Sequence, residues 1–138
     1  MRDLNRIILH CSATKEGQDF SAATIRGWHV NGRGWSDIGY HWVIRLDGTI
    51  EVGRPLDRSG AHTKGENKDS VGVCYIGGLD EDGKPKDTMS PEQEKAWRMI
   101  VLSLRTLYGN HITIHGHNEF SAKACPSFVV KEKFADMY

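Results

Sequence analysis

Apolar residues along this chain gather in short runs. Residues 6–11 (Arg-Ile-Ile-Leu-His-Cys) and residues 70–77 are the clearest of these runs, and the second ends at a pair of glycines. Apolar runs of this length between polar flanks are typical of buried strands. Residues 111–115 alternate between polar and apolar positions, which predicts another strand.

A hairpin is predicted in the second quarter of the chain. Residues 40–46 and 49–53 flank the pair Asp47-Gly48. Because Asp-Gly favours the tight turn between antiparallel strands, the two segments are expected to pair. Residues 54–69 are polar and show little periodicity, and they predict a surface loop.

The strongest helix signal begins at Ser90. Ser90 is an N-cap, Pro91 suits the first helical position, and Gln93 completes a capping box. Gly109 ends the helix. Its apolar stripe consists of Trp97, Ile100, Val101, Leu104, Leu107 and Tyr108.

Two shorter helices complete the pattern. Ser21 is an N-cap for a helix over residues 22–31, which Gly32 and Gly34 end, and residues 127–136 predict a short closing helix. Strands separated by helices predict an α/β fold with a central mixed sheet flanked by helices. A chain of 138 residues is expected to form a single domain over residues 1–138.

Composition narrows the functional classes. The chain carries 18 basic and 18 acidic residues, so it lacks the basic excess of a nucleic-acid-binding protein. No apolar stretch approaches the roughly 20 residues that span a bilayer. The first residues lack the apolar stretch and cleavage site of a signal peptide. We therefore expect a cytoplasmic monomer, unless a holin or a specialised secretion system releases it.

The three cysteines do not predict a disulfide framework. Cys74 lies in an apolar run and is interpreted as a core residue. Cys11 follows His10 in a predicted strand, so the two side chains face opposite ways. Only Cys125 lies in a polar, loop-like segment.

The segment from His117 to Pro126 carries the most specific chemistry. His117 and Cys125 are eight residues apart, and Lys123 precedes the cysteine by two. Imidazole and thiolate are good zinc ligands, and a catalytic zinc takes three protein ligands and one open position. His10 is the best third ligand, because sites in α/β folds gather at strand ends.

The motifs around these positions resemble a known family. Their order along the chain resembles the zinc-dependent N-acetylmuramoyl-L-alanine amidases of the type 2 group, including short phage endolysins, and more distantly the peptidoglycan recognition proteins. The resemblance extends from about residue 6 to residue 134. The motifs are Ile8 to Thr14, Gly39 to Ile44, Asp47 to Glu51, Gly60 to His62, Asn67 to Val73, and His117 to Phe128.

The resemblance implies an activity and a role for particular residues. The activity is hydrolysis of the amide between N-acetylmuramic acid and the L-alanine of the peptidoglycan stem peptide. His10, His117 and Cys125 match the ligands of one zinc ion, although many relatives carry aspartate at the position of Cys125. Tyr40 and Lys123 match residues beside the metal, with Lys123 stabilising the oxyanion. His41 and His62 match positions that line the substrate groove.

Several residues have competing interpretations. His115 precedes His117 by two and could be mistaken for the ligand, but the spacing to Cys125 and the motif favour His117. Glu119 could be a general base, yet a capping or solvated carboxylate explains it equally well. We interpret His29 and His111 as surface or edge residues and Trp97 as core. Tyr40 could equally be a core aromatic at a strand end.

Three functions compete on these grounds. The first is a zinc amidase that lyses peptidoglycan, as an endolysin does, or recycles muropeptides in the cytoplasm. The second is a peptidoglycan-binding module without catalysis, which usually lacks a ligand. The third is a structural zinc site, which needs a fourth nearby cysteine or histidine. All three candidate ligands are present here, which favours the enzyme.

Overall fold

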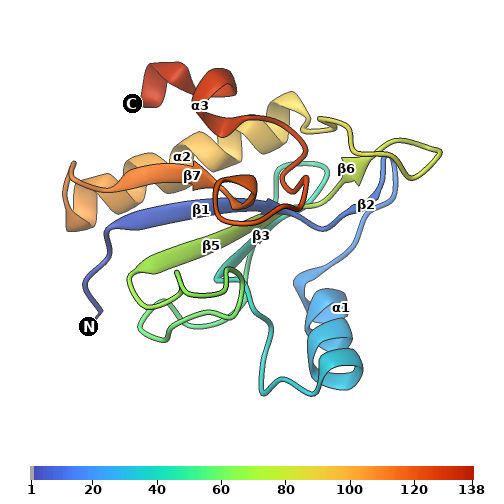
Figure 1. The fold of residues 1–138 in the computed structure, drawn as a ribbon, viewed down its shortest axis with the longest axis horizontal. Coiled ribbons are helices and arrows are strands. Elements are labelled where there is room, and N and C mark those ends of the chain that lie inside the picture. The colour runs from blue at the N-terminus through green and yellow to red at the C-terminus, as the bar shows by residue number, and fades with distance from the viewer. Residues whose placement is uncertain (1) are drawn as a thin grey trace.

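Five strands form the central sheet of the computed structural model, which describes residues 2–138 (Figure 1). Their order across the sheet is β4-β3-β5-β1-β7. The strands are β1 (Arg6–Cys11), β3 (Trp42–Ile44), β4 (Ile50–Val52), β5 (Ser70–Tyr75) and β7 (Thr113–Gly116).

The sheet is mixed, as the sequence predicts. β1 lies between β5 and β7 and is parallel to both, and β3 is parallel to β5. Only β4 runs antiparallel, paired with β3 through the predicted hairpin at Asp47-Gly48. The carboxyl ends of four strands therefore meet at one edge, where α/β folds collect ligands.

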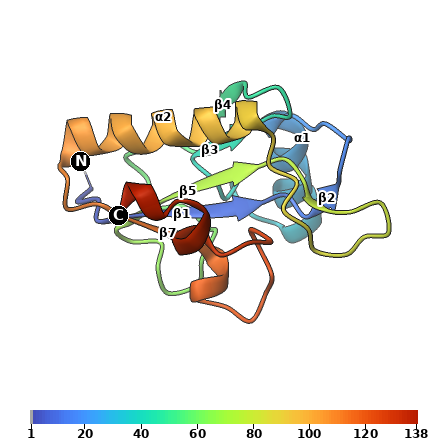
Figure 2. The ribbon, with the colours of Figure 1, turned by 90° about the horizontal axis from the view of Figure 1, so that it is seen from above.

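The long helix α2 (Pro91–Tyr108) covers one face of the sheet, while the loops directly after β4 and β7 lie on the other side (Figure 2). The predicted capping box at Ser90 and Gln93 is present. Trp97 is completely buried against the sheet, as expected of the core. The main core between α2 and the sheet includes Ile7, Leu9, Val71, Val73, Trp97, Val101, Leu104 and Ile114.

The two shorter helices begin or end differently from the prediction. Ser21 caps α1 (Ala22–Gly27), and the chain continues as the π-helical turn η1 (Trp28–Gly32). Near the C-terminus, α3 (Val130–Lys133) is followed by the 3-10 helix η3 (Ala135–Met137). Each of these two predicted spans was thus longer than the α-helix that lies within it.

Three elements were not predicted. β2 (Thr14–Lys15) and β6 (Gly78–Leu79) pair in a separate parallel ribbon, and the 3-10 helix η2 (His117–Glu119) follows β7. Elements of two or three residues are too short for a periodic signal. Within residues 2–138, no helix has the length and apolar character needed to cross a membrane.

Candidate metal centre and substrate groove

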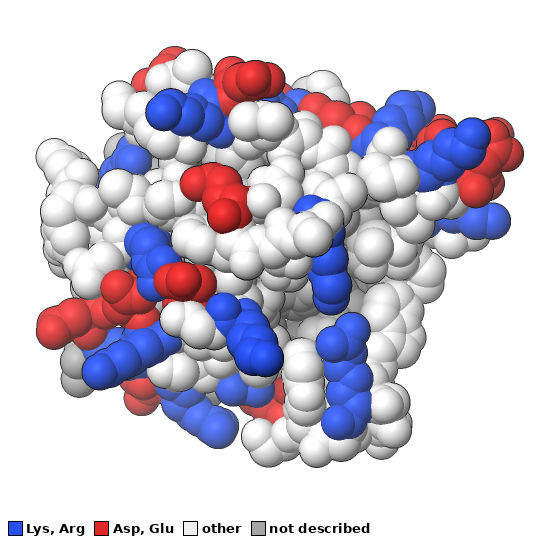
Figure 3. All heavy atoms as spheres, in the orientation of Figure 1, with Lys and Arg blue, Asp and Glu red and all other residues white. Residues whose placement is uncertain are grey.

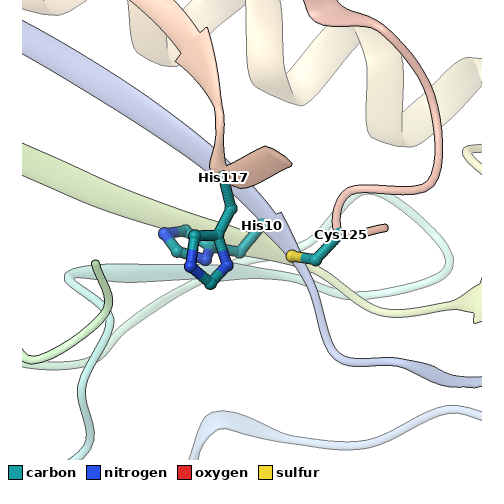
Figure 4. Close-up of side chains that lie close together, drawn as sticks. All are labelled: His10, His117 and Cys125. Atoms are coloured by element: carbon teal, nitrogen blue, oxygen red, sulfur yellow. The ribbon is translucent and has the colours of Figure 1, made fainter. Parts of the chain in front are cut away.

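Three side chains from separate elements converge at the carboxyl edge of the sheet (Figure 4). His10 lies near the end of β1, His117 opens η2 directly after β7, and Cys125 comes from the following loop. Alternation along β1 places Leu9 and Cys11 in the core under α2 and leaves His10 on the other face. One candidate ligand atom from each of the three residues lies within 4.8 Å of the others.

The chemistry of these donors suits a divalent metal ion such as zinc. Burial, with the nearby His62, His117 and Lys123, lowers the pKa of His10 well below its usual value. Burial and Lys123 also lower the pKa of His117. Both imidazoles are therefore neutral at neutral pH, and each has a lone pair for a metal.

Cys125 completes this donor set. Its neighbour Cys11 and its burial raise the pKa of the Cys125 thiol, so the thiolate needs a compensating cation. The backbone N–H of Cys11 donates a hydrogen bond to the Cys125 sulfur, with 3.1 Å between nitrogen and sulfur. A metal ion beside two neutral imidazoles would supply the cation, and the donor set fits a His-His-Cys zinc centre.

A groove of about 560 Å³ lies beside His117. In Figure 3 this face of the molecule is hollowed, and lysine and arginine side chains stand around the hollow. The described residues that line the groove include no Asp or Glu. They are Arg33, Trp35, Ala61, His62, Thr63, Lys64, Asn67, His117, Phe120, Ser121 and Lys123.

Lys123 and Tyr40 approach the cluster from different sides. Lys123 is exposed and lines the groove, and its charge acts on both His10 and His117.

The Tyr40 ring lies 5.1 Å from the His10 ring, measured between their centroids. Burial raises the pKa of Tyr40 well above its usual value, so its phenol stays protonated at neutral pH. Tyr40 does not line the groove. It faces a smaller cavity of about 140 Å³ together with Ser12, His29 and Arg33.

His41 is not brought into the groove. The ring is 1% exposed, and both of its nitrogens contact backbone groups. Nδ1 accepts a hydrogen bond from the N–H of Gly72 at 3.0 Å, and Nε2 lies 2.7 Å from the carbonyl of Arg58. These contacts tie the 54–69 segment to β5, which is a supporting role for the groove wall.

His62 does line the groove, but its ring is 9% exposed and turned towards the cluster. Its Nδ1 lies 2.9 Å from Nε2 of His10 and 3.0 Å from the hydroxyl of Thr63.

The segment over residues 54–69 was predicted to be a surface loop. It contains no strand or helix, but His62, Thr63 and Arg54 are buried.

His29 corrects another expectation. It was expected at the surface or an edge, but it is 8% exposed and packs against Trp35 and Tyr40. Its Nδ1 accepts the N–H of Gly39 at 2.9 Å. The helical spacing of residues 22–31 could have indicated this inward position, since Ile25 and His29 share one face.

His115 and Glu119, which the sequence analysis placed outside the site, both have structural partners. Nδ1 of His115 lies 2.9 Å from the carboxylate of Glu119, and that carboxylate also accepts the N–H of Gly116. Glu119 therefore caps the turn that presents His117, and His115 is not part of the ligand cluster.

A His-His-Cys cluster beside an open groove, at the carboxyl edge of a mixed sheet, is the arrangement of a metallohydrolase. The model of the N-acetylmuramoyl-L-alanine amidase family matches residues 1–128. The chain therefore belongs to this family, and its activity is hydrolysis of the amide that joins N-acetylmuramic acid to the L-alanine of peptidoglycan.

Similar proteins, compared one by one, support the assignment of this chain to the amidase family. The endolysin of Klebsiella phage KP32 is 43% identical over 130 residues, covering 94% of this chain and 85% of the endolysin. The solved structure of the N-acetylmuramoyl-L-alanine amidase LysC from Clostridium intestinale has a TM-score of 0.80 at 28% identity, covering 97% of this chain and 87% of LysC. The peptidoglycan recognition protein PGRP-SA of a bumblebee has a TM-score of 0.83 at 29% identity, covering 99% of this chain and 83% of that protein.

Proposed function

We propose that the whole chain is one zinc-dependent amidase domain that lyses peptidoglycan as a phage endolysin does. The observation that carries the metal assignment is the convergence of His10, His117 and Cys125 within 4.8 Å beside the groove. The 43% identity to the endolysin of a Klebsiella phage supports the lytic role. Such an enzyme acts on the cell wall after release from the cytoplasm, and we propose that it works as a monomer.

His10, His117 and Cys125 would hold the zinc ion. When bound, zinc would polarise the amide carbonyl and lower the pKa of its bound water to about 7. The amide also needs help from the protein, because negative charge develops on the carbonyl oxygen as the tetrahedral intermediate forms.

Lys123 and Tyr40 are proposed as the catalytic residues of the chain. Lys123 is exposed on the groove beside both histidines, and its ammonium can stabilise the oxyanion. Tyr40 keeps its proton at neutral pH, so its hydroxyl can donate a hydrogen bond to a reacting oxygen or nitrogen but cannot act as a base.

The charge of the groove supports a substrate with free carboxylates. Arg33, Lys64 and Lys123 line the groove, and no acidic residue is among the described lining residues. Stem peptides carry carboxylates beyond the L-alanine, so we propose that Arg33 and Lys64 attract that part of the substrate. His62 forms part of the groove wall, while His41 supports the wall from behind.

One experiment tests the metal and the reaction together. We expect purified protein to hold about one zinc ion per chain and to release free stem peptide from cell walls without new reducing sugar ends. Cys125→Ser should lose both zinc and activity. His111→Ala is the control, because it changes an exposed imidazole outside the cluster and should keep both. New reducing ends would identify a glycosidase and overturn the proposal.

A further inference from the structure

The second ring nitrogen of His10 has partners that the proposed ligand role does not explain. Its Nε2 lies 2.9 Å from Nδ1 of His62 and 3.2 Å from the hydroxyl of Thr63. Only Nδ1 of His10 is therefore left for a metal ion. A neutral imidazole carries one proton, and Nδ1 can bind a metal only when that proton is on Nε2.

The hydrogen bonds around His62 fix the position of this proton. The hydroxyl of Ser70 lies 2.6 Å from the carbonyl oxygen of Glu66, and a carbonyl can only accept, so Ser70 donates to it. The Ser70 oxygen is then an acceptor towards Nε2 of His62, 3.4 Å away. His62 carries its proton on Nε2, and its Nδ1 is left as an acceptor.

The same direction of hydrogen bonding then extends to His10. Nδ1 of His62 accepts from Nε2–H of His10 at 2.9 Å. Thr63 does not change this assignment, because its hydroxyl can accept a hydrogen bond from Nε2–H of His10 and donate one to Nδ1 of His62. Both rings then carry their proton on Nε2. The opposite assignment would leave Nε2 of His62 facing Ser70 without a donor.

The His62 ring packs directly against two glycines, where no side chain would fit. A Cβ added at Gly72 would lie 2.5 Å from the His62 ring, and one at Gly60 would lie 2.6 Å from it. Oδ1 of Asn67 accepts the backbone N–H groups of both His62 and Thr63. The ring is therefore held closely both by β5 and by its own loop.

We infer that His62 is a positioning residue of the metal centre: it holds His10 as the Nε2–H tautomer and so aims the free Nδ1 of His10 at the metal. This inference rests on the proposed zinc site. Partners of ligating histidines are known to matter in this way, and their removal typically weakens metal binding about 10- to 100-fold. A residue that only lined the groove would change substrate binding and leave zinc affinity unaltered.

The test compares zinc affinity across three variants by competition with a chromophoric chelator. His62→Phe keeps the size of the ring and removes the acceptor, so we expect zinc affinity to fall about 10- to 100-fold. His62→Asn keeps an acceptor oxygen near the position of Nδ1 and should recover most of the loss. His111→Phe makes the same change at an exposed position outside the cluster and should bind zinc as the wild type does.

A second measurement observes the tautomer of His10 directly. Long-range ¹H–¹⁵N spectra of the metal-free wild-type protein should show His10 protonated at Nε2, and His62→Phe should show a mixture of tautomers. Unchanged zinc affinity in a folded His62→Phe protein, or an Nδ1–H tautomer of His10 in the wild type, would overturn the inference. Failure of the wild type to bind zinc would instead overturn the proposed function, so the two failures are distinguishable.

Discussion

The proposed role of Lys123 can be tested separately from metal binding. It lies on the groove and acts electrostatically on two candidate ligands, but it is not one of them. A lysine at this position can contribute to catalysis without contributing to metal binding. That separation distinguishes it from His10, His117 and Cys125.

We predict that Lys123→Ala keeps zinc and lowers kcat by about 10²- to 10³-fold, the usual effect of removing one oxyanion stabiliser. Zinc content by atomic absorption and turnover of a soluble muropeptide would be measured on the same preparation. Lys131→Ala, an exposed lysine on α3, is the control and should leave both unchanged. A Lys123→Ala protein that has lost its zinc would contradict the assigned role.

At the scale of elements, α2 is connected to the sheet by one buried amide. Gln93 is completely buried, and its Nε2 donates to the carbonyl oxygens of Ile44 at the end of β3 and of Ile76 just beyond β5. Its Oε1 accepts the N–H of Ser90 and so forms half of the capping box. The start of α2 and the ends of two strands are thereby held in register.

We predict that Gln93→Glu lowers the free energy of unfolding by at least about 1–3 kcal/mol, because a carboxylate cannot donate to the two carbonyls and is itself buried. Chemical denaturation followed by circular dichroism measures the change. Gln18→Glu makes the same substitution at an exposed position and should be nearly neutral. Equal stability of the two variants would show that the amide does not hold α2 on the sheet.

At the scale of the whole molecule, the distribution of charge matters more than its sum. The formal net charge is zero, yet the groove is lined by three cations and, among the described residues, by no carboxylate. Acidic residues elsewhere have cationic partners, for example Glu66 and Asp69, which both pair with Arg6. The groove is therefore a local positive region on a neutral protein.

We predict that Lys64→Gln and Arg33→Gln each lower kcat/KM about threefold to fivefold for stem peptides with free carboxylates, since an exposed ion pair contributes up to about 1 kcal/mol. Stem peptides with amidated carboxylates should show little change, and added salt should reduce the difference. Lys95→Gln, on α2 across the sheet from the groove, is the control. Equal losses for both kinds of substrate would argue against carboxylate recognition.

Local patterns were enough for much of the fold. β1, the hairpin at Asp47-Gly48 and the capped helix α2 were predicted because each is specified by residues close together in the sequence. The π-helical turn after α1 and the two-residue strands β2 and β6 were missed. The first is an irregularity within a helical pattern, and the others exist only through pairing with a distant segment.

The sequence by itself determined the family, because several specific motifs occur in order from His10 to Cys125. It also indicated the chemistry, since imidazole and thiolate are intrinsic properties of these residues. Only the tertiary structure decided how the residues meet. Strand order brings His10 and His117 together. The fold of residues 54–69 places His62 behind His10, and the contacts of His41 with Arg58 and Gly72 keep it away from the groove. Contacts between segments more than fifty residues apart depend on packing, and no local pattern encodes them.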